Sequence, residues 1–349
     1  MSFPFNVYVA AILSAGITTA ISLPFWCKWC LKAGLVDDPG HRKIHTEPTA
    51  LAGGLAVMTG VVIPLICGFT VVLWLGGSVD YFGPPPPADQ PLGLLPDGSH
   101  RLALRPDLLL YGLSRRGKEL MGILAGAIGM IFVGVLDDKH ELRPSFKFAG
   151  QLAVAAIVAA SGARITLFVP SLLFSYAITI LWILTLINAF NFMDNMNGLC
   201  AGLGAIGAWC FGLRAGGDGQ YLVASIALLT FGALLGFLPY NFPNARVFLG
   251  DAGSHLVGYL LAVLAILPHF YSARNPHKWA VLIPLLVLAV PLGDLAWVVL
   301  LRWHKGQPFY QGDTNHLSHR LERLGLSRSF TVILIWLLAA AVGSVAVLL

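Results

Sequence analysis

Charged residues are scarce in this chain. Asp, Glu, Lys and Arg together make up 11% of its 349 residues, whereas a soluble protein of this size carries about 25%. Hydrophobic residues make up 57%, and the mean hydropathy is +0.76, so lipid is expected to be the main solvent. The net charge of +5 is small, and no run of Lys and Arg is dense enough for a nucleic-acid site. The composition therefore predicts a membrane protein without a nucleic-acid partner.

Cysteine is also scarce, and its five positions are scattered. Cys27 and Cys30 form a C-x-x-C pair with no second pair and no histidine ligand nearby. Membrane packing therefore accounts for them better than zinc or redox chemistry, and no disulfide framework is indicated. The N-terminus has no basic region before its first apolar stretch, so a cleaved signal peptide is not expected. The sequence has no internal repeat.

Long hydrophobic runs occupy most of the remaining sequence. A membrane-spanning helix needs about 20 apolar residues. About ten candidates lie at residues 5–30, 52–76, 118–136, 146–161, 172–190, 198–214, 220–240, 253–270, 279–301 and 329–349. They predict an all-α integral membrane protein with one polytopic membrane domain over residues 1–349. The fourth and sixth candidates are short and rich in Ala and Gly, so both are predicted to be buried helices.

Ten spans would place both termini on one side of the membrane and alternate the connections between the two faces. Most of the Lys and Arg residues fall in the connections 31–51, 137–147, 191–197, 241–252 and 302–328. By the positive-inside rule this set is predicted to be cytoplasmic. Residues 77–117, with four consecutive prolines at 84–87, are predicted to form an extracytoplasmic loop insertion without a catalytic role.

Two adjacent carboxylates, Asp137 and Asp138, end the third hydrophobic run. Ionisable groups near lipid are costly and suggest a function. Neighbouring residues on a helix point about 100° apart, so one carboxylate could meet a metal or a reacting phosphate while the other orients a lysine. Lys147 begins the next helix and could neutralise a phosphate. The alternative is a helix end with ordinary interfacial charges.

Four polar residues recur at intervals of three after the fifth hydrophobic run: Asn188, Asn191, Asp194 and Asn197. This spacing predicts that they share one helical face. Amide and carboxylate oxygens can ligate Mg²⁺ or hydrogen-bond a nucleobase. A polar helix cap is the alternative, and it accounts less well for four such residues.

Asp251 lies between Gly250 and the small residues Ala252, Gly253 and Ser254. The small neighbours leave room for a ligand at the positive end of the next helix. A plain N-cap aspartate would give the same local pattern.

Basic residues lie in two further connections. In the first, Lys43 and His45 precede Gly53–Gly54; they could receive an anionic headgroup or diphosphate, or form a solvated basic loop. In the last, His316 and His319 would share a helical face, with Arg320 adjacent. No Glu or Cys stands at zinc-ligand spacing, so contact with a phosphate or sugar is favoured. Oxygen-rich sites suit Mg²⁺, with Mn²⁺ as an alternative.

Five segments, in this order, carry a family resemblance: DDPGHRKIHTEPTALAGG, GVLDDKHELRPSFKFAGQ, NAFNFMDNMNGL, VFLGDAGS and GDTNHLSHRL, the last preceded by PLGD. They resemble the motifs of the polyprenyl-phosphate N-acetylhexosamine-1-phosphate transferase family, over nearly the whole chain except residues 77–117. The resemblance implies transfer of N-acetylglucosamine-1-phosphate from a UDP-sugar donor to a polyprenyl phosphate acceptor, releasing UMP. It also implies a bacterial plasma-membrane enzyme that initiates cell-envelope polysaccharide synthesis on the cytoplasmic face; a homodimer is compatible with it.

The same resemblance implies roles for individual residues. Asp251 and Asn191 would hold Mg²⁺ against the donor diphosphate, and Asp137 and Asp138 would organise catalysis. The remaining assignments are that Lys147, His316, His319 and Arg320 contact phosphates or sugar, Asp194 and Asn197 lie near the uridine, and Lys43 and His45 assist the acceptor.

Three positions depart from the family pattern: Asn195 stands in place of Gly, Asn197 in place of Asp, and Ser318 in place of the middle His. A muramoyl-pentapeptide donor is the alternative within the family, although HLSHRLERLG is closer to the N-acetylglucosamine branch. A cation-coupled transporter is the alternative outside it. A transporter should carry acids near the bilayer midplane, and only Asp294 fits that position.

Overall fold

The computed structural model describes residues 3–38, 48–75, 106–268, 270, 278–308 and 314–349, and this part of the chain is almost entirely helical. Its helices are α1 (Phe5–Ala33), α2 (Gly53–Leu75), α3 (Pro106–His140), α4 (Pro144–Ser161), α5 (Leu172–Met193), α6 (Leu199–Gly217), α7 (Tyr221–Asn241), α8 (Gly250–Leu264), α9 (Ile283–Val287), α10 (Ala289–His304), α11 (Leu317–Arg323) and α12 (Arg328–Leu348). A 3₁₀ turn, η1 (Lys278–Leu282), precedes α9. Two short antiparallel strands, β1 (Val36–Asp37) and β2 (Thr49–Ala50), flank the first connection. The predicted all-α membrane fold is confirmed.

Each predicted span corresponds to a helix or, in one case, to a broken helix. Eight helices of the described chain are long and apolar enough to cross a membrane. α8 has only 15 residues, but every one except Asp251 is buried. The predicted continuous span 279–301 is wrong, because the chain bends by 75° between the segments Trp279–Val287 and Ala289–His304. Pro291 lies in the first turn of α10 and cannot donate to the carbonyl four residues earlier, which interrupts the helix there.

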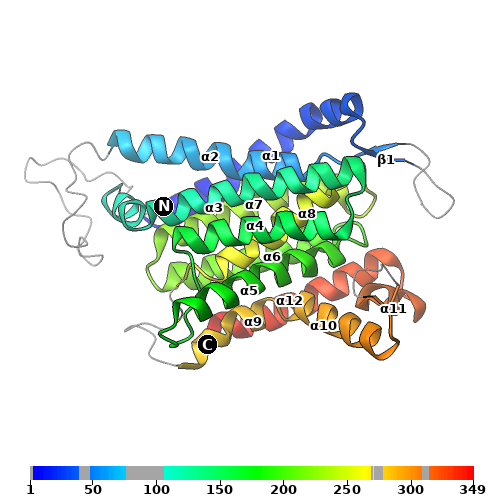
Figure 1. The fold of residues 1–349 in the computed structure, drawn as a ribbon. Coiled ribbons are helices and arrows are strands. Elements are labelled where there is room, and N and C mark those ends of the chain that lie inside the picture. Colours follow the sequence, from blue (N-terminus) through cyan, green and yellow to red (C-terminus); the bar gives the residue numbers. More distant parts are fainter. Residues whose placement is uncertain (1–2, 39–47, 76–105, 269, 271–277, 309–313) are drawn as a thin grey trace, which may run out of the picture.

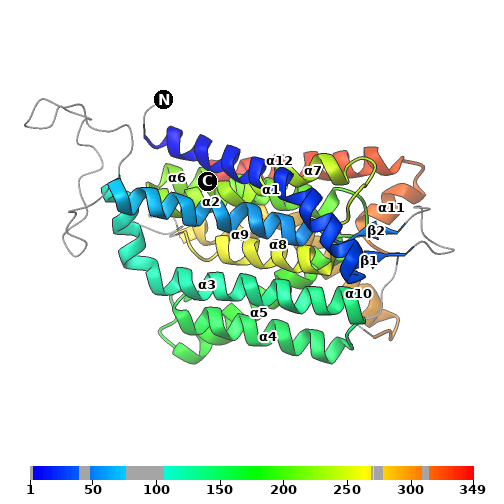
Figure 2. The same ribbon diagram turned by 90° about the horizontal axis from the view of Figure 1, so that it is seen from above.

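The long helices lie side by side, and both termini lie at the same end of the bundle, as the even number of predicted spans requires (Figures 1 and 2). β1 and α11 lie at the opposite end (Figure 1). The described parts of the connections predicted to be cytoplasmic therefore gather there.

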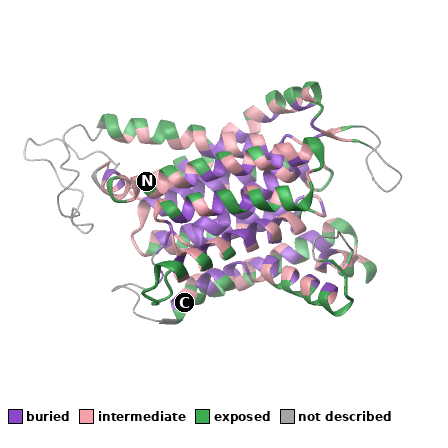
Figure 3. Ribbon diagram, viewed as in Figure 1, coloured by how far each residue is buried: buried purple, intermediate pink, exposed green. Residues whose placement is uncertain are grey.

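The two helices that are rich in Ala and Gly differ in how far they are buried. α6 lies in the core and is mostly buried, as predicted. α4 lies at the edge of the bundle and exposes Phe146, Phe148 and Ile157, so the prediction that it is buried is wrong (Figure 3). Its small residue Gly150 packs against Val133 of α3, while its bulky side chains face outward. Small residues therefore indicate one close contact but do not reveal whether the opposite face is covered.

The third span starts earlier than predicted. α3 begins at Pro106, so residues 106–117 of the predicted loop are its first turns. Its 35 residues span about 52 Å at 1.5 Å per residue, more than the roughly 30 Å of hydrocarbon in a bilayer. The proline run lies outside the described residues, and the boundary of an insertion there stays a prediction.

Close backbone approaches bring α2 and α3 to the start of α8. A Cβ atom at Gly134 would overlap the backbone of Ala252, and one at Gly54 would overlap Gly253. The backbone N–H groups of Gly53 and Gly54 donate to the carbonyls of residues 248 and 249, both at 3.0 Å. Gly53 and Gly54 therefore serve close packing between the start of α2 and the start of α8.

Candidate active site

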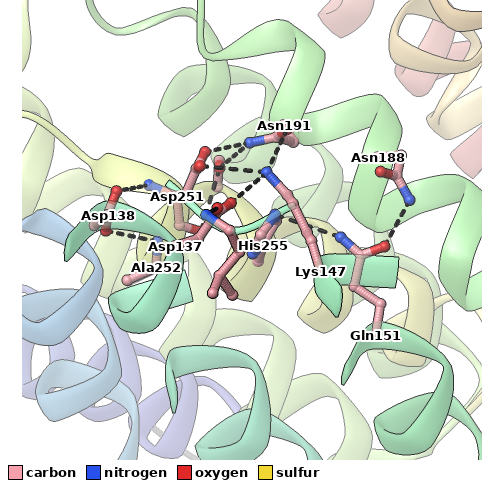
Figure 4. A network of polar contacts seen from close by, with 11 residues as sticks. Asp137, Asp138, Lys147, Gln151, Asn188, Asn191, Asp251, Ala252 and His255 are labelled. Carbon is pink, nitrogen blue, oxygen red and sulfur yellow. Dashed lines mark hydrogen bonds and ion pairs between the residues drawn. The ribbon is translucent and has the colours of Figure 1, made fainter. Parts of the chain in front are cut away.

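Lys147 is the centre of a polar network drawn from α3, α4, α5 and α8 (Figure 4). Its Nζ atom lies 2.7 Å from Asp137 Oδ2 and 3.2 Å from Asp251 Oδ2. It also donates to Asn191 Oδ1 at 3.4 Å. Three oxygens from three helices therefore converge on one positive charge. Lys147 and Asp251 keep 20% and 35% of their side chains exposed, so this charge stays accessible from outside.

Asn191 connects the network to α8 through its amide nitrogen. Nδ2 donates to Asp251 Oδ1 at 2.6 Å and to Ser254 Oγ at 3.0 Å. The amide is thereby oriented with its oxygen toward Lys147, since the two acceptors fix the position of the NH₂ group. Asp251 is held from one side by Asn191 and from the other by Lys147.

Asp137 and Asp138 point to different partners, as their adjacency on a helix predicts. The carboxylate of Asp138 accepts the backbone N–H groups of Asp251 at 2.7 Å and of Ala252 at 3.0 Å. It therefore satisfies two unpaired donors at the start of α8. Asp137 is buried and pairs with Lys147, and its other oxygen accepts from the backbone N–H of Leu142 at 3.0 Å.

Behind Lys147 lies a chain of polar side chains, in which Asn188 meets two residues, Gln151 and His255, that were not singled out from the sequence. Asn188 Nδ2 donates to Gln151 Oε1 at 2.9 Å, and Gln151 Nε2 lies 3.4 Å from His255 Nε2. Gln151 and His255 are almost fully buried. His255 follows Asp251 by one helical turn, a spacing that could have indicated it.

The prediction that the four residues of NAFNFMDNMNG share a helical face is wrong. Helix α5 ends at Met193, so Asp194 and Asn197 lie in the connection to α6. Asn188 faces Gln151 (Figure 4). Asn191, Asp194 and Asn197 still meet, because all three line one cavity.

That cavity has a volume of about 550 Å³ and opens at the end of the bundle. Carboxylates line much of it: Asp37, Asp38, Asp137, Asp138, Glu141, Asp194 and Asp251. The amides of Asn191, Asn195, Asn197 and Asn241 add further polar groups, and Phe248 adds an aromatic side chain. A second cavity of about 570 Å³ shares Asp37, Asn195, Met196, Asn197 and Phe248 with the first and adds His319 and Arg328. The two form adjoining parts of one polar region.

The crowding of carboxylates changes the pKa of Asp194. Its side chain is exposed and lines the cavity, and the protein around that cavity partly desolvates the carboxylate. Together with the negative charges of Asp251 and Asp138, this raises the pKa of Asp194 from its ordinary value to about 8. The cavity therefore holds more negative charge than Lys147 alone compensates.

The connection around Asp194 is fixed by Asn241, which no sequence pattern indicated. Asn241 Oδ1 accepts the backbone N–H of Gly198 at 2.6 Å, and Nδ2 donates to the carbonyl of Val247 at 2.9 Å. Asn197 Nδ2 donates to the carbonyl of Pro243 at 3.1 Å. The connections α5–α6 and α7–α8 are therefore tied together beside the cavity.

The residues of the last polar segment occupy three different surroundings. His316 is buried, with Nδ1 2.6 Å from Asp294 Oδ2 and its ring edge against Phe192. It lines neither of the two polar cavities. His319 lines the second cavity and lies 3.4 Å from Glu322.

Arg320 lies apart from both histidines. Its guanidinium stacks over Trp297 at 4.7 Å from the ring centroid and lines a separate apolar pocket. The structure therefore brings His319, but not His316 or Arg320, to the polar region. Lys43 and His45 lie outside the described residues.

Two of the three residues that depart from the family pattern, Ser318 and Asn195, contact each other. Ser318 Oγ donates to Asn195 Oδ1 at 2.8 Å, across 123 residues of sequence.

The ligand atoms around Lys147 fit a divalent cation. Asp137, Asp251 and His255 each offer one ligand atom, and these atoms lie within 4.8 Å of one another. The oxygens that converge on the Lys147 ammonium already stabilise a positive charge. Two carboxylates and an amide oxygen are hard ligands of the type that Mg²⁺ takes. His255 Nδ1 is buried and, within the described chain, makes no hydrogen bond.

A multi-pass helical bundle with an acidic cavity at one end, in which carboxylates converge on a cation, fits an integral membrane transferase of phosphate-linked groups. The model for glycosyl transferase family 4 matches residues 120–269. This range runs from within α3 through α8 and includes every residue of the Lys147 network. A probable undecaprenyl-phosphate N-acetylglucosaminyl 1-phosphate transferase of Bacillus subtilis is 31% identical over 95% of this chain and 82% of its own length. The chain belongs to this family of polyprenyl-phosphate N-acetylhexosamine-1-phosphate transferases.

Two further relatives agree with this assignment. The decaprenyl-phosphate N-acetylglucosaminephosphotransferase of Mycobacterium tuberculosis strain H37Rv is 31% identical over 88% of this chain and 73% of its own length. The undecaprenyl-phosphate alpha-N-acetylglucosaminyl 1-phosphate transferase of Escherichia coli K12 is 29% identical over 97% and 82%. The matches extend beyond residues 120–269 and therefore include most of the chain on both sides of the network.

Proposed function

We propose that this enzyme transfers N-acetylglucosamine-1-phosphate from UDP-N-acetylglucosamine to undecaprenyl or a similar polyprenyl phosphate and releases UMP. The names of the relatives support the donor sugar and the lipid acceptor. The observation that carries the proposal is the convergence of Asp137, Asp251 and Asn191 on Lys147 beside an open polar cavity. The site would face the cytoplasm of a bacterial plasma membrane and start the synthesis of a cell-envelope polysaccharide.

The proposed cofactor is Mg²⁺, with Mn²⁺ as an alternative. Asp251, Asp137 and Asn191 would hold it, and the bound ion would neutralise the diphosphate of the donor. Asp138 accepts two backbone N–H groups of α8, which favours a role in positioning Asp251. Each of its two oxygens accepts one of these N–H groups.

Positively charged side chains of this protein can offset the repulsion between the two phosphates that react. The attacking group is a phosphate monoester with a second pKa of about 6, so much of it is dianionic at neutral pH and needs little deprotonation. Two anionic phosphates must approach each other, and phosphoryl transfer depends mainly on positioning and charge neutralisation. Lys147 supplies a positive charge beside the first cavity, next to the lining residues Asp137 and Asp251, and His319 lines the second cavity.

The uridine is proposed to bind at the wall formed by the two tied connections. Asp194 and Asn197 offer acceptors and a donor there, and Phe248 offers an aromatic side chain where the two cavities meet. The acceptor phosphate would approach from the membrane side, where Lys43 and His45 are the proposed contacts. A transporter would depend on Asp294. Asp294 is buried and paired with His316, so it is not available to bind a transported cation.

The test is UMP release by the purified full-length protein in lipid nanodiscs. UDP-N-acetylglucosamine, polyprenyl phosphate and Mg²⁺ are supplied together, and each is omitted in turn. We expect UMP and the lipid-linked sugar to form in equal amounts, and EDTA to stop both. A UDP-muramoyl-pentapeptide donor runs in parallel, and faster turnover with it would reverse the choice of donor. Absence of UMP with every UDP-sugar would refute the transferase reaction.

A further inference from the structure

One hydrogen bond links the α5–α6 connection to α11. Ser318 Oγ donates to Asn195 Oδ1 at 2.8 Å. The amide nitrogen of Asn195 donates in turn to the backbone carbonyl of Phe192 at 2.8 Å. Because both ends of the amide have partners, its oxygen is directed at Ser318 by the network. The bond therefore joins a fixed amide to a hydroxyl on a different element.

The surroundings of this bond prevent water from replacing it. Ser318 is fully buried, with no exposed area. A buried hydroxyl that loses its partner keeps the cost of its desolvation. Asn195 belongs to the wall of both polar cavities. The bond thus lies directly behind the surface that faces the proposed donor.

Helix α11 depends on such contacts for its position. It has only seven residues, and an isolated helix of this length is not stable in water. Asp294 Oδ1 accepts the backbone N–H of Leu317 at 2.6 Å, and Asn195 holds the next residue. His319 follows immediately and lines the second cavity. Two consecutive residues of α11 are therefore anchored, one to α10 and one to the connection that carries Asp194.

We propose that Asn195 and Ser318 form a positioning pair that fixes the imidazole of His319 relative to the acidic cavity. This inference rests on the proposed transfer reaction and adds to it two residues that act through His319. Without the bond, α11 shifts away from the connection, and His319 no longer meets the reacting phosphates in a fixed geometry. Donor binding depends on other groups in the first cavity. The pair is therefore expected to affect kcat more than the donor KM.

The test is a double-mutant cycle in the full-length protein with Ser318→Ala, Asn195→Leu and the combined variant. Each single change should lower kcat about 10-fold, in the range seen for residues that orient functional groups, and change the donor KM less than about twofold. The combined variant should be no slower than the slower single variant, because both remove the same bond. Ser318→Thr keeps the hydroxyl and should recover most of the rate. Multiplying losses would overturn the proposal.

Ser225→Ala is the matched control. Ser225 is also buried, but its hydroxyl donates only within α7, to the carbonyl of Tyr221 at 2.8 Å. We expect its kcat to stay within about twofold of wild type. If Ser225→Ala reduces kcat as much as Ser318→Ala, the loss reflects general packing and the proposal is wrong.

Hydrogen exchange provides a readout that does not depend on the reaction. Ser318→Ala and Asn195→Leu should speed amide exchange in residues 317–323 about 10-fold, with no change in the middle of α5. Unchanged exchange in α11 would refute the positioning pair even if kcat falls. If the wild-type protein releases no UMP from any UDP-sugar, the transfer reaction fails, and the exchange rates still decide whether the pair holds α11.

Discussion

The carboxylates around Lys147 and the carboxylate beside His316 lie at the same end of the bundle but in opposite surroundings. Asp137 and Asp251 share one ammonium group and border an open cavity. Asp294 is buried and gives one oxygen to His316 Nδ1 and the other to the N–H of Leu317, both at 2.6 Å. The oxygens of Asp137, Asp251 and Asn191 face the Lys147 ammonium group beside a cavity, so a metal ion could take its place among them. In the Asp294–His316 pair both carboxylate oxygens already accept a hydrogen bond, so this pair holds the start of α11 against α10.

The largest effect that would test this contrast is expected from Asp251→Asn. The amide keeps the shape of the side chain but removes the negative charge at the centre of the proposed cation site. UMP release should fall by more than about 100-fold, beyond the usual effect of residues that only orient a ligand. The thermal stability of the purified protein should remain near wild type. Turnover close to wild type would remove Asp251 from the site.

Lys147→Met is expected to act on stability as well as rate. Without the ammonium group, Asp137 stays buried without its partner. Because Lys147 and Asp251 are partly exposed, we expect a loss of about 1–3 kcal/mol, less than for a fully buried pair. Added Mg²⁺ should raise the melting temperature of this variant more than that of wild type. Equal shifts would show that Lys147 and the divalent cation do not occupy neighbouring positions. Lys147→Arg is the charge-preserving control.

Asp294→Asn addresses the closed pair directly. We expect UMP release to fall about 10–100-fold, because His316 and the start of α11 lose an ionic anchor while the Lys147 network stays intact. In contrast to Lys147→Met, the loss of thermal stability should be insensitive to Mg²⁺. A melting temperature that Mg²⁺ restores would place Asp294 in the cation site and abolish the distinction between the two clusters.

The smallest effect is expected from Glu322→Gln. Hydrogen bonding to Arg328 lowers the pKa of Glu322, with a smaller contribution from His319. A lowered pKa in the folded state means that its stabilising contribution is present above the ordinary glutamate pKa of about 4.3 and is lost as pH falls through the folded value. Thermal melting between pH 3 and 7 should show a shallower acid decline in Glu322→Gln. The rate of UMP release at neutral pH should change only slightly, because the Glu322–Arg328 pair is at the surface.

Much of the fold could be predicted from the sequence because helix length and apolar composition are local properties. Nine of the ten hydrophobic runs became single helices, and the common end of the two termini followed from the even number of runs. The break in the ninth run was missed although Pro291 marks it. The exposure of α4 was missed because Ala and Gly content does not reveal how many neighbours a helix has.

The candidate site was predicted as a set of residues but not as an arrangement. Asn191 and Asp251 were expected to meet at a metal, with Asp137 among the catalytic residues, and all three lie within one network. Asp138 was expected near the chemistry, and its oxygens hold the start of α8. Asn188 and Arg320 point elsewhere. Gln151 had no distinguishing pattern, because a single polar residue in a hydrophobic run does not show its partner, and His255 was indicated only by its spacing of one helical turn from Asp251.

By itself the sequence determined the solvent, the positions of the long helices and the end of the bundle at which the polar residues gather, since each depends on composition within a short stretch. The tertiary structure alone decided which carboxylates share a cation and which are closed off. That decision depends on contacts such as Gly134 with Ala252 and Gly54 with Gly253. They set the distance between helices that are far apart in the chain, and no periodicity within one helix encodes that distance.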